Sequence, residues 1–300
     1  MPSPGLRFGE SQSVQHLLRV AGLVALTSNP ILILGEPGTG KTALARHLHT
    51  ISGRPGAFVR CSMASLSEGI REDELQGHVR GSFTGAIGDR MGLVETAHRG
   101  TLFLDELGAA SPAAQASLLH LLDDQVVRRL GESRDRPVDA RFIVATNADV
   151  VDLAKSARFR ADLLGRFGYF RFTVPPLRER RDEIIPLFGV FLEEADPRRA
   201  GASNELEPAV QECLLAAPWP DNIRELRAVA RYVAVVSSIH GQIGLEDLPL
   251  DFRAAQGAIH RHKDRRAAAR EVLTRCNGNI SRAAVEIGVS RTQLRRLLGS

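Results

Sequence analysis

The residues with the clearest chemistry form the segment GEPGTGKT, residues 35–42. Glycines in such a loop let backbone N–H groups approach an anion closely, because no Cβ atoms intervene. A lysine at this position reaches the β- and γ-phosphates of ATP, and the hydroxyl that follows it can bind Mg²⁺. The predicted nucleotide site consists of Gly35, Glu36, Pro37, Gly38, Thr39, Gly40, Lys41 and Thr42, with Thr42 as a metal ligand.

Two acidic residues follow an apolar run in the segment TLFLDE. Asp105 and Glu106 would lie at the carboxyl end of a buried strand, which is where α/β sheets bind their ligands. We expect Asp105 to hold Mg²⁺ and Glu106 to polarise the water that attacks the γ-phosphate. Downstream of a phosphate-binding loop, this pair predicts ATP hydrolysis rather than nucleotide binding alone.

Four further polar residues could act on the phosphates. Asn147 ends the apolar run FIVATN and could reach the γ-phosphate or the water, although asparagine also forms turns. Arg160 and Arg166 lie in FRADLLGRF, and an arginine supplied by a neighbouring subunit can stabilise charge on a transferring phosphoryl group. Both could equally be solvated surface residues. Arg224, early in an expected helix, could fold over the nucleotide.

A sheet is needed to position these residues. The apolar runs ILILG, AFVRC, TLFLDEL, ARFIVATN and YFRFTV read as strands, and segments with a helical pattern occur at residues 11–28, 41–51 and 112–123. Strands that alternate with helices predict a parallel sheet covered on both faces, the α/β class. After PPLRER the strand pattern stops, and residues 180–250 have a helical pattern.

Charge is unevenly distributed along the chain, whose net charge is +4. Residues 253–300 contain eleven Lys and Arg against three Asp and Glu, which is +8, so residues 1–252 carry −4. A basic end on an acidic body indicates a module that binds a polyanion. A solvated basic face is the alternative.

The basic end contains NGNISRAAVEIGVSRTQLRRLL, which has a helix-turn-helix pattern. A helix over residues 280–287 is followed by a turn at Gly288 and a second helix capped by Ser290. Arginine and glutamine can recognise base edges in the major groove of double-stranded DNA, and other arginines can bind phosphates. A small helical cap with a basic face is the alternative. The predicted DNA contacts are Ser290, Arg291, Thr292, Gln293, Arg295 and Arg296.

The composition argues against a membrane or secreted protein. No apolar run approaches the roughly 20 residues of a membrane-spanning helix, and the first nine residues lack the pattern of a secretory signal. Cys61, Cys213 and Cys276 have no metal-ligand spacing. We therefore expect a protein of the reducing cytoplasm without a membrane partner.

With these motifs the sequence resembles the bacterial enhancer-binding proteins, the AAA+ ATPases that activate sigma-54 RNA polymerase. The resemblance extends from about residue 7 to residue 298, and its most specific part is ELQGHVRGSFTGA, similar to the family's ELFGH and GAFTGA signatures. It implies a surface loop that contacts sigma-54, with Phe83 and Thr84 at its tip. Flanking glycines suit a mobile exposed loop, whereas a buried core aromatic is the alternative for Phe83. The loop comprises Gly81, Ser82, Phe83, Thr84, Gly85 and Ala86.

The same resemblance implies roles and an assembly. It makes Asp105 and Glu106 the Walker B pair, and Asn147 the sensor I residue. Because arginine fingers act between subunits, it also implies a ring, most simply a hexamer, that forms from a dimer in the resting state. The remaining roles are arginine fingers for Arg160 and Arg166 and sensor II for Arg224.

Four residues depart from the family pattern. Ser82 replaces the loop's usual alanine, a change between small residues that we expect to be tolerated. Gln76 replaces a phenylalanine, which could weaken anchoring of the loop. Ser62 replaces an asparagine that restrains the catalytic glutamate, so the shorter side chain puts that coupling in doubt. Thr42 stands where the family often has glutamate.

Four regions are therefore expected: an AAA+ α/β ATPase subdomain over residues 7–175, a small helical lid over 176–252, a linker over 253–264 and a Fis-type helix-turn-helix domain over 265–300. Only six residues precede the ATPase region, so we expect no N-terminal regulatory domain. Control would then come from expression level or from a regulatory protein acting in trans.

The expected protein binds upstream DNA, assembles a ring, and hydrolyses ATP to remodel sigma-54 RNA polymerase holoenzyme and open the promoter. The alternative is an AAA+ DNA-binding regulator of other promoters that has lost sigma-54 coupling. A third possibility, an unrelated AAA+ machine such as a chaperone or helicase loader, is disfavoured by the loop and the helix-turn-helix.

Overall fold

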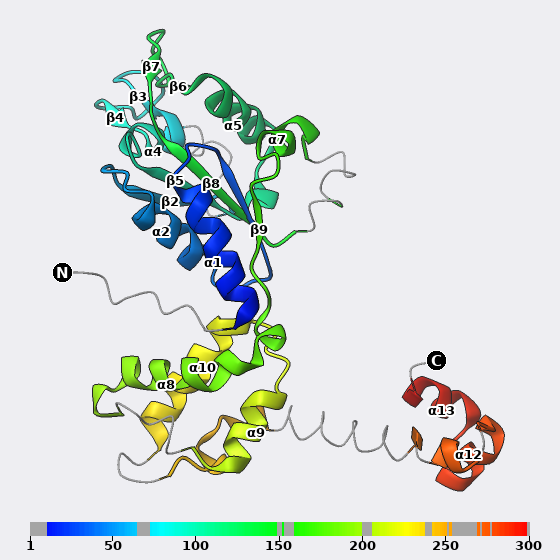
Figure 1. Cartoon of the computed structure of the whole chain (residues 1–300). Coiled ribbons are helices and arrows are strands. Elements are labelled where there is room, and N and C mark those ends of the chain that lie inside the picture. The colour runs from blue at the N-terminus through cyan, green and yellow to red at the C-terminus, as the bar shows by residue number, and fades with distance from the viewer. Residues whose placement is uncertain are drawn as a thin grey trace. The chain divides into compact units, whose positions relative to one another are not determined.

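The computed structural model describes residues 11–64, 73–148, 152, 159–199, 206–237, 242–250, 252–253, 269–270, 272–276 and 278–298. The chain divides into two compact units, shown in Figure 1. The first comprises Met1–Leu187 and Trp219–Arg227, and the second comprises Phe188–Pro218 and Ala228–Ser300. Each unit is described by itself.

A five-stranded sheet forms the centre of the first unit, with strand order β2-β5-β8-β1-β9. All four neighbouring pairs are parallel, and every apolar run predicted as a strand contributes one. Ser62 pairs with Asp105 and Leu34 with Thr146, so the carboxyl ends of the strands meet at one edge. The strands are β1 (Ile31–Leu34), β2 (Phe58–Ser62), β5 (Thr101–Asp105), β8 (Arg141–Thr146) and β9 (Arg171–Thr173).

Helices cover both faces of this sheet, as the alternating pattern predicts (Figure 1). On one face α1 (Gln12–Ala25) and α2 (Lys41–Ile51) pack on side chains that include Ile33 and Phe103. On the other face, three helices pack on the strand residues that come directly before and after Ile33 and Phe103 in the sequence. These helices are α4 (Leu93–Thr96), α5 (Pro112–Asp124) and α7 (Ala161–Arg166). In the three central strands β1, β5 and β8, successive residues are buried on opposite faces, which explains why these strands are largely apolar.

Serine caps begin two of these helices. The Ser11 hydroxyl accepts a hydrogen bond from Val14 N at 3.4 Å, and the Ser111 hydroxyl accepts one from Ala114 N at 3.3 Å. Each hydroxyl satisfies an N–H that has no partner within the helix. A serine directly before the first helical residue thus marks the start of each of these helices.

Two short hairpins extend from the layers around the sheet. The first joins β3 (Gly77–His78) to β4 (Arg90–Met91), and the segment 81–86, predicted as an exposed loop, lies between the two strands. The second joins β6 (Val126–Val127) to β7 (Arg136–Pro137), and no sequence pattern predicted it. The two are linked, because Leu130 N donates to Gly77 O at 2.9 Å and Val79 N donates to Leu130 O at 3.1 Å.

The first unit extends beyond the boundary expected at residue 175. The short 3₁₀ helices η2 (Leu177–Glu179) and η3 (Arg181–Glu183) belong to it, as does the segment Trp219–Arg227. The side chain of Asn222 accepts a hydrogen bond from Leu177 N and donates one to Pro37 O. Side-chain bonds of this kind attach a segment of the expected lid to the sheet-containing unit.

Helices make up the regular elements described in the second unit, as the pattern over residues 180–250 predicts. Its apolar core includes Phe188, Leu192, Leu214 and Val233. The helices that lie in or run into it are α8 (Ile184–Ala195), η4 (Pro197–Arg199), α9 (Pro208–Ala216), α10 (Asn222–Val236), η6 (Leu245–Asp247), α12 (Ile280–Ile287) and α13 (Arg291–Leu298).

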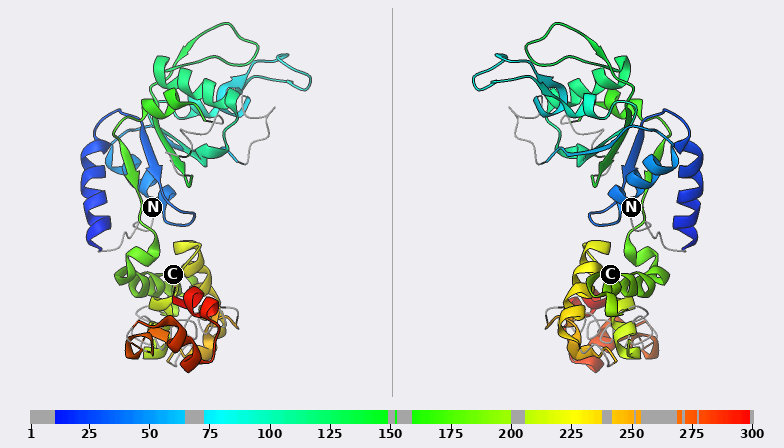
Figure 2. Two further views of the ribbon diagram at one scale, coloured as in Figure 1. Left: turned by 90° about the vertical axis from the view of Figure 1, so that its right-hand side faces the viewer. Right: turned by 90° about the vertical axis from the view of Figure 1, so that its left-hand side faces the viewer.

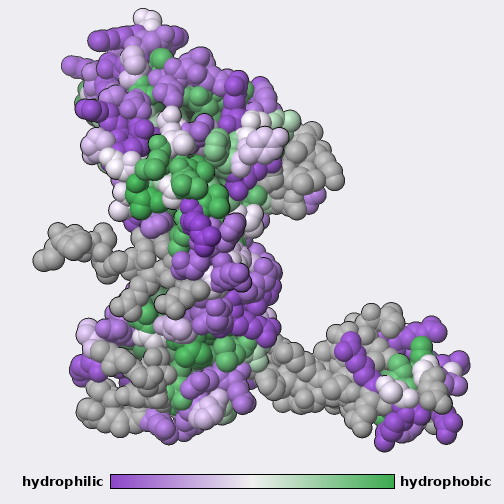
Figure 3. All heavy atoms as spheres, viewed as in Figure 1, coloured by the Kyte–Doolittle hydropathy of each residue, from purple (hydrophilic) through white to green (hydrophobic). Residues whose placement is uncertain are grey.

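Apolar side chains reach the surface in several places on the first unit (Figure 3). Along α1, the exposed large hydrophobic residues are Val20 and Leu23 within the helix and Leu26 directly after it, of which Leu26 is 75% exposed. In the described parts of the chain, no helix is long and apolar enough to cross a membrane.

Candidate nucleotide site

The glycine-rich segment 35–42 connects β1 to α2. Gly38 has φ +72° and Gly40 has φ +106°, which are conformations that glycine adopts without strain. A side chain at Gly38 is also excluded by space, because a Cβ there would lie 2.0 Å from Asp221 O. The helix α2 begins at Lys41 without a side-chain cap, so its first N–H groups are available to an anion.

Lys41 lies among the charged groups that the sequence selected. Its Nζ donates to Gly35 O at 2.7 Å and to Glu36 O at 2.9 Å. Burial is the main cause that lowers the pKa of Lys41, while Asp105 and Glu106 raise it and Arg224 lowers it. The structure therefore brings these three residues close to the lysine.

The residues predicted to bind Mg²⁺ face each other across α2 and β5. Thr42 Oγ1 donates to Asp105 Oδ2 at 3.4 Å, and Arg60 Nη2 contacts the same carboxylate oxygen at 3.0 Å. Hydroxyl and carboxylate oxygens are the ligands that Mg²⁺ prefers, so the donor set fits this ion. Arg60 was not predicted, because no sequence pattern shows that β2 and β5 are neighbours.

Glu106 follows Asp105 in a left-handed backbone conformation, with φ +58°. Ser62 Oγ donates to Glu106 Oε2 at 2.6 Å, across the neighbouring strands β2 and β5. The sequence raised the question whether a serine is long enough to hold this glutamate. The hydrogen bond shows that Ser62 reaches its carboxylate.

Asn147 lies at the same edge of the sheet. It directly follows β8, whose neighbours are β1 and β5, and its side chain is exposed. The strand before it is buried throughout. Asn147 is therefore placed between the strand that precedes the phosphate-binding loop and the strand that carries Asp105.

Arg160 directly precedes α7, and Arg166 is the last residue of this helix. Arg160 Nη2 is 2.7 Å from Asp162 Oδ2, and Arg166 Nη2 is 2.7 Å from Asp123 Oδ2. The two arginine side chains are 47% and 53% exposed, respectively. The ion pairs described for them involve neighbouring acids and not the phosphate-binding loop of their own chain. Both remain accessible to another molecule.

Arg224 lies in the first turn of α10, close to the phosphate-binding loop. Its neighbour Ile223 donates a backbone hydrogen bond to Gly38 O at 3.0 Å. A Cβ built on Gly38 would lie 3.1 Å from the Cβ of Arg224. The structure thus brings Arg224 to the loop, as expected, although 182 residues separate it from Thr42 in sequence.

The carboxylate of Glu36, in the phosphate-binding loop, is held by hydrogen bonds from other segments of the chain. Hydrogen bonds from Arg178 and Asn222 lower the pKa of Glu36 to about 2, so the group is ionised at neutral pH. Sequence reasoning missed both partners. The segment PPLRER, which contains Arg178, marked only the end of the strand pattern, and nothing in the sequence indicated that Arg178 and Asn222 meet this glutamate.

The segment 81–86 projects from the first unit between β3 and β4 (Figure 2). Gly81 and Gly85 have φ of +81° and +106°, and Gly81 N donates to Ala86 O at 2.9 Å. Thr84 is exposed, and Phe83 is 46% exposed with its ring edge-on to His78 at 5.0 Å between centroids. Phe83 is therefore not a buried core aromatic.

The second hairpin supports this loop. A Cβ at Gly131 would lie 2.6 Å from the Cβ of Ser82, so the two segments are in direct contact. The Ser82 hydroxyl is buried and has no hydrogen-bond partner among the described residues. Replacing Ser82 by the family's usual alanine would therefore remove no hydrogen bond described at this position.

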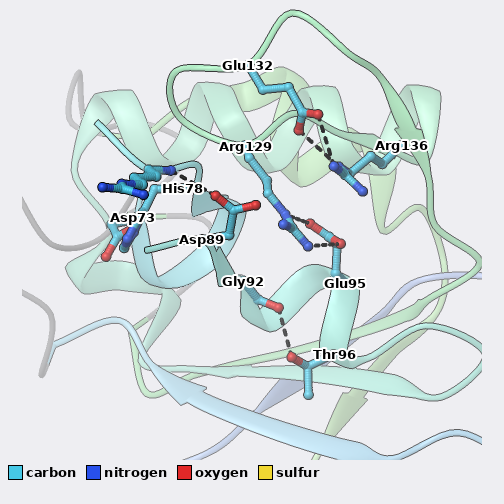
Figure 4. A network of polar contacts seen from close by, with 10 residues as sticks. Asp73, His78, Asp89, Gly92, Glu95, Thr96, Arg129, Glu132 and Arg136 are labelled. Atoms are coloured by element: carbon cyan, nitrogen blue, oxygen red, sulfur yellow. Dashed lines mark hydrogen bonds and ion pairs between the residues drawn. The ribbon is translucent and has the colours of Figure 1, made fainter. Parts of the chain in front are cut away.

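Figure 4 shows the polar groups at the base of both hairpins. Arg129 binds Glu95 through two hydrogen bonds, of 2.7 and 2.8 Å, with both side chains about nine-tenths buried. The His78 ring bonds to Asp73, and Arg136 bonds to Glu132. Charged pairs with two hydrogen bonds are directional, so the Arg129–Glu95 pair fixes the second hairpin against α4.

The C-terminal helices have the predicted helix-turn-helix pattern. Ala283, Ala284 and Leu294 are buried together, and Gly288 has φ +75° in the turn. Ser290 Oγ accepts from Gln293 N at 3.1 Å, which confirms the serine cap.

The predicted DNA contacts differ in how they are engaged. Arg291, Thr292 and Arg295 are exposed on α13. Gln293 is also exposed, but its Oε1 accepts from Ser290 N at 2.9 Å, so the side chain completes a capping box. Only its amide nitrogen remains to donate to a base in this arrangement. The side chain of Arg296 lies outside the described residues.

Comparison with known proteins identifies three matching families. The model for the sigma-54 interaction domain matches residues 7–173, that for the AAA+ ATPase lid domain matches 178–265, and that for bacterial regulatory proteins of the Fis family matches 268–298. The first of these alone covers more than half of the chain.

Curated relatives and a solved structure agree with these matches. The nitric oxide reductase transcription regulator NorR1 of Cupriavidus necator is 36% identical over 96% of this chain and 62% of its own length. The transcriptional regulatory protein ZraR of Klebsiella oxytoca is 37% identical over 97% of this chain and 69% of its own. The structure of NtrX from Brucella abortus in complex with ATP has a TM-score of 0.73 and 28% identity, over 98% of this chain and 69% of that one.

The first curated relatives are longer than this chain, which spans 62% and 61% of two nitric oxide reductase regulators from Cupriavidus necator. The matched families nevertheless cover the sheet-containing region, the lid and the C-terminal helices. The chain therefore belongs to the sigma-54-dependent enhancer-binding proteins, regulators of transcription that combine an AAA+ sigma-54 interaction domain with a Fis-type helix-turn-helix.

Proposed function

We propose that this chain hydrolyses ATP in the presence of Mg²⁺ and uses the reaction to remodel sigma-54 RNA polymerase holoenzyme. The observation that carries the proposal is the convergence of Lys41, Thr42, Asp105 and Glu106 at the carboxyl edge of the sheet. Phosphoryl transfer depends mainly on positioning and charge stabilisation, and these four groups supply both. The ATP-bound structure of NtrX supports nucleotide binding by this fold.

Each group has a distinct task in this mechanism. Backbone N–H groups of the loop and of the first turn of α2 would bind the phosphates, and Lys41 would exchange its two carbonyl partners for phosphate oxygens. Thr42 and Asp105 would hold Mg²⁺, which neutralises charge on the phosphates. Glu106 would orient the attacking water and accept its proton, and Asn147 would contact the water or the γ-phosphate.

Control of Glu106 gives a first prediction. We expect Ser62→Ala to raise the basal rate of ATP hydrolysis about fivefold, because a hydrogen bond of about 1 kcal/mol that restrains the carboxylate is lost. Steady-state phosphate release measures the effect. Ser62→Asn, which keeps a side-chain donor, is the control and should stay near the wild-type rate. A lower rate for Ser62→Ala would show instead that Ser62 holds Glu106 in its productive position.

The arginine fingers require a second subunit. Arg160 and Arg166 are accessible and pair only with nearby acids in the described contacts, so they are suited to reach a neighbour's nucleotide. Exposed apolar side chains on α1 provide surface of the kind that association buries. We therefore propose a ring, most simply a hexamer, that assembles from dimers.

The loop and the C-terminal helices would select the partners. Exposed Phe83 and Thr84 would contact sigma-54, and the Arg129–Glu95 pair of Figure 4 would couple the hairpin that contacts this loop to α4. Arg291, Thr292 and Arg295 would contact an upstream DNA site. Gln293 would contribute mainly by fixing the start of α13.

Open-complex formation tests this proposal. Wild-type protein with ATP and sigma-54 holoenzyme should form open complexes on a sigma-54 promoter, and Thr84→Ala should form none while hydrolysing ATP within about twofold of wild type, because the loop lies outside the nucleotide site. Thr50→Ala removes an exposed threonine of α2 and is the matched control.

Two other outcomes would change the conclusion. If wild type hydrolyses ATP but opens no promoter, the sigma-54 function is wrong and a regulator of other promoters is favoured. If Thr84→Ala opens the promoter as wild type does, the loop is not the contact that drives opening.

A further inference from the structure

The phosphate-binding loop is held by residues from two segments distant in sequence. Arg178 binds the Glu36 carboxylate through both terminal nitrogens, at 2.7 Å from Nη1 to Oε2 and 2.5 Å from Nη2 to Oε1. Asn222 Nδ2 lies 3.2 Å from Glu36 Oε2 and 3.0 Å from Pro37 O. The loop is thus bonded through a side chain and through its backbone.

Asn222 is specialised for this position. It is fully buried, and its amide oxygen accepts from Leu177 N at 2.7 Å while its nitrogen serves Glu36 and Pro37. Its backbone has φ +52°, in the left-handed region where asparagine is one of the few tolerated side chains. Glycine would fit this backbone but could make none of the three side-chain bonds.

The backbone beside Asn222 also contacts the loop. Ile223 N donates to Gly38 O at 3.0 Å, and the space where Gly38 would carry a Cβ is occupied by Asp221 O. The next residue is Arg224, whose charge acts on Lys41. A shift of Arg224 away from the phosphate site would therefore break backbone and side-chain bonds to the loop.

We infer that Asn222 and Arg178 are positioning residues for nucleotide binding, which act through Glu36, Pro37 and Gly38. They hold the loop in its binding shape before the nucleotide arrives, and they fix Arg224 beside it. A loop that is already ordered loses less conformational freedom when it binds a ligand. The inference rests on the proposed nucleotide site. It adds that Asn222 and Arg178, which lie outside the phosphate-binding loop, hold this loop in place.

Calorimetric titration of the full chain with Mg²⁺ and ADP tests this role without hydrolysis. We expect Asn222→Gly to weaken ADP binding about thirtyfold, because three hydrogen bonds of a buried side chain are lost, and Arg178→Met about fivefold, because its ion pair is partly exposed. Arg198→Met is the matched control, since Arg198 makes a similar two-bond pair with Asp196 in the second unit. Its ADP affinity should equal that of wild type.

A double variant separates positioning from a general loss of structure. If Asn222 acts through Arg224, Asn222→Gly should weaken ADP binding much less in an Arg224→Ala background than in wild type. Melting temperatures without nucleotide show which variants are folded. If Asn222→Gly does not fold, Arg178→Met, which changes an exposed side chain, decides the question.

The results that would overturn the inference are distinct from those that would overturn the nucleotide site. ADP affinities within twofold of wild type for folded Asn222→Gly and Arg178→Met would reject a positioning role. Fully multiplicative effects of Asn222→Gly and Arg224→Ala would reject action through Arg224. Failure of wild type to bind ADP would reject the proposed nucleotide site itself.

Discussion

Glu106→Gln should lower ATP hydrolysis about 10³-fold, the range expected when a general base is removed. Glutamine keeps the shape of the side chain and can accept a hydrogen bond from Ser62, but it cannot accept the proton of the attacking water. ADP affinity should change less than about threefold, because the proposed phosphate contacts come from the loop and from Lys41. Phosphate release and calorimetric titration of the same preparation measure the two effects.

Two companion variants make this result specific. Lys41→Ala should lose both ADP affinity and hydrolysis, since its ammonium group is proposed to contact the phosphates directly. Glu193→Gln removes an exposed carboxylate of α8 and should match wild type. If Glu106→Gln retained wild-type turnover, another residue would have to be the base, and the assignment of the site would fail.

Arg160→Ala should lower hydrolysis about 10³-fold if its guanidinium completes a neighbour's site. The ion pair with Asp162 would then be exchanged for the γ-phosphate of the next subunit. Because the finger and the base would come from different subunits, two inactive variants should complement each other. Equal mixing of Arg160→Ala with Glu106→Gln should restore about a quarter of the wild-type rate, since random assembly pairs an intact base with an intact finger at about one site in four.

The mixing experiment distinguishes a finger in trans from a residue needed within its own chain. If Arg160 acted in cis, no mixture would exceed the sum of the separate rates. Arg166→Ala, mixed in the same way, tests the second proposed finger. Arg198→Ala, which breaks an ion pair in the second unit, is the control. It should hydrolyse ATP at the wild-type rate by itself, without being mixed with another variant.

Local sequence was sufficient for the elements with strong patterns. The five apolar runs form the five strands, and the serines before α1 and α13 cap them. These features depend on residues close in sequence, such as a hydroxyl that bonds an N–H three positions later. The small hairpin of β6 and β7 was missed, because two-residue strands carry no period and depend on contacts with the neighbouring loop.

The candidate site was predicted unevenly for the same reason. Lys41, Thr42, Asp105 and Glu106 were found because their motifs are contiguous, and the strand pattern placed them at one edge. The partners Arg60, Arg178 and Asn222 were not found as site residues. Each reaches its contact only through the pairing of strands or the docking of a distant segment.

The sequence by itself determined the chemistry of this protein: a phosphate-binding loop, an acidic pair after a buried strand, a glycine-flanked exposed loop and a basic helix pair. Only the tertiary structure decided which groups restrain that chemistry. Arg60 meets Asp105 because β2 lies beside β5, and Asn222 meets the loop because Trp219–Arg227 packs with the first unit. The physical reason is the distance along the chain between the residues in contact. A motif consists of residues close in sequence, whereas the residues that restrain the site are far apart in sequence and meet only when the chain folds.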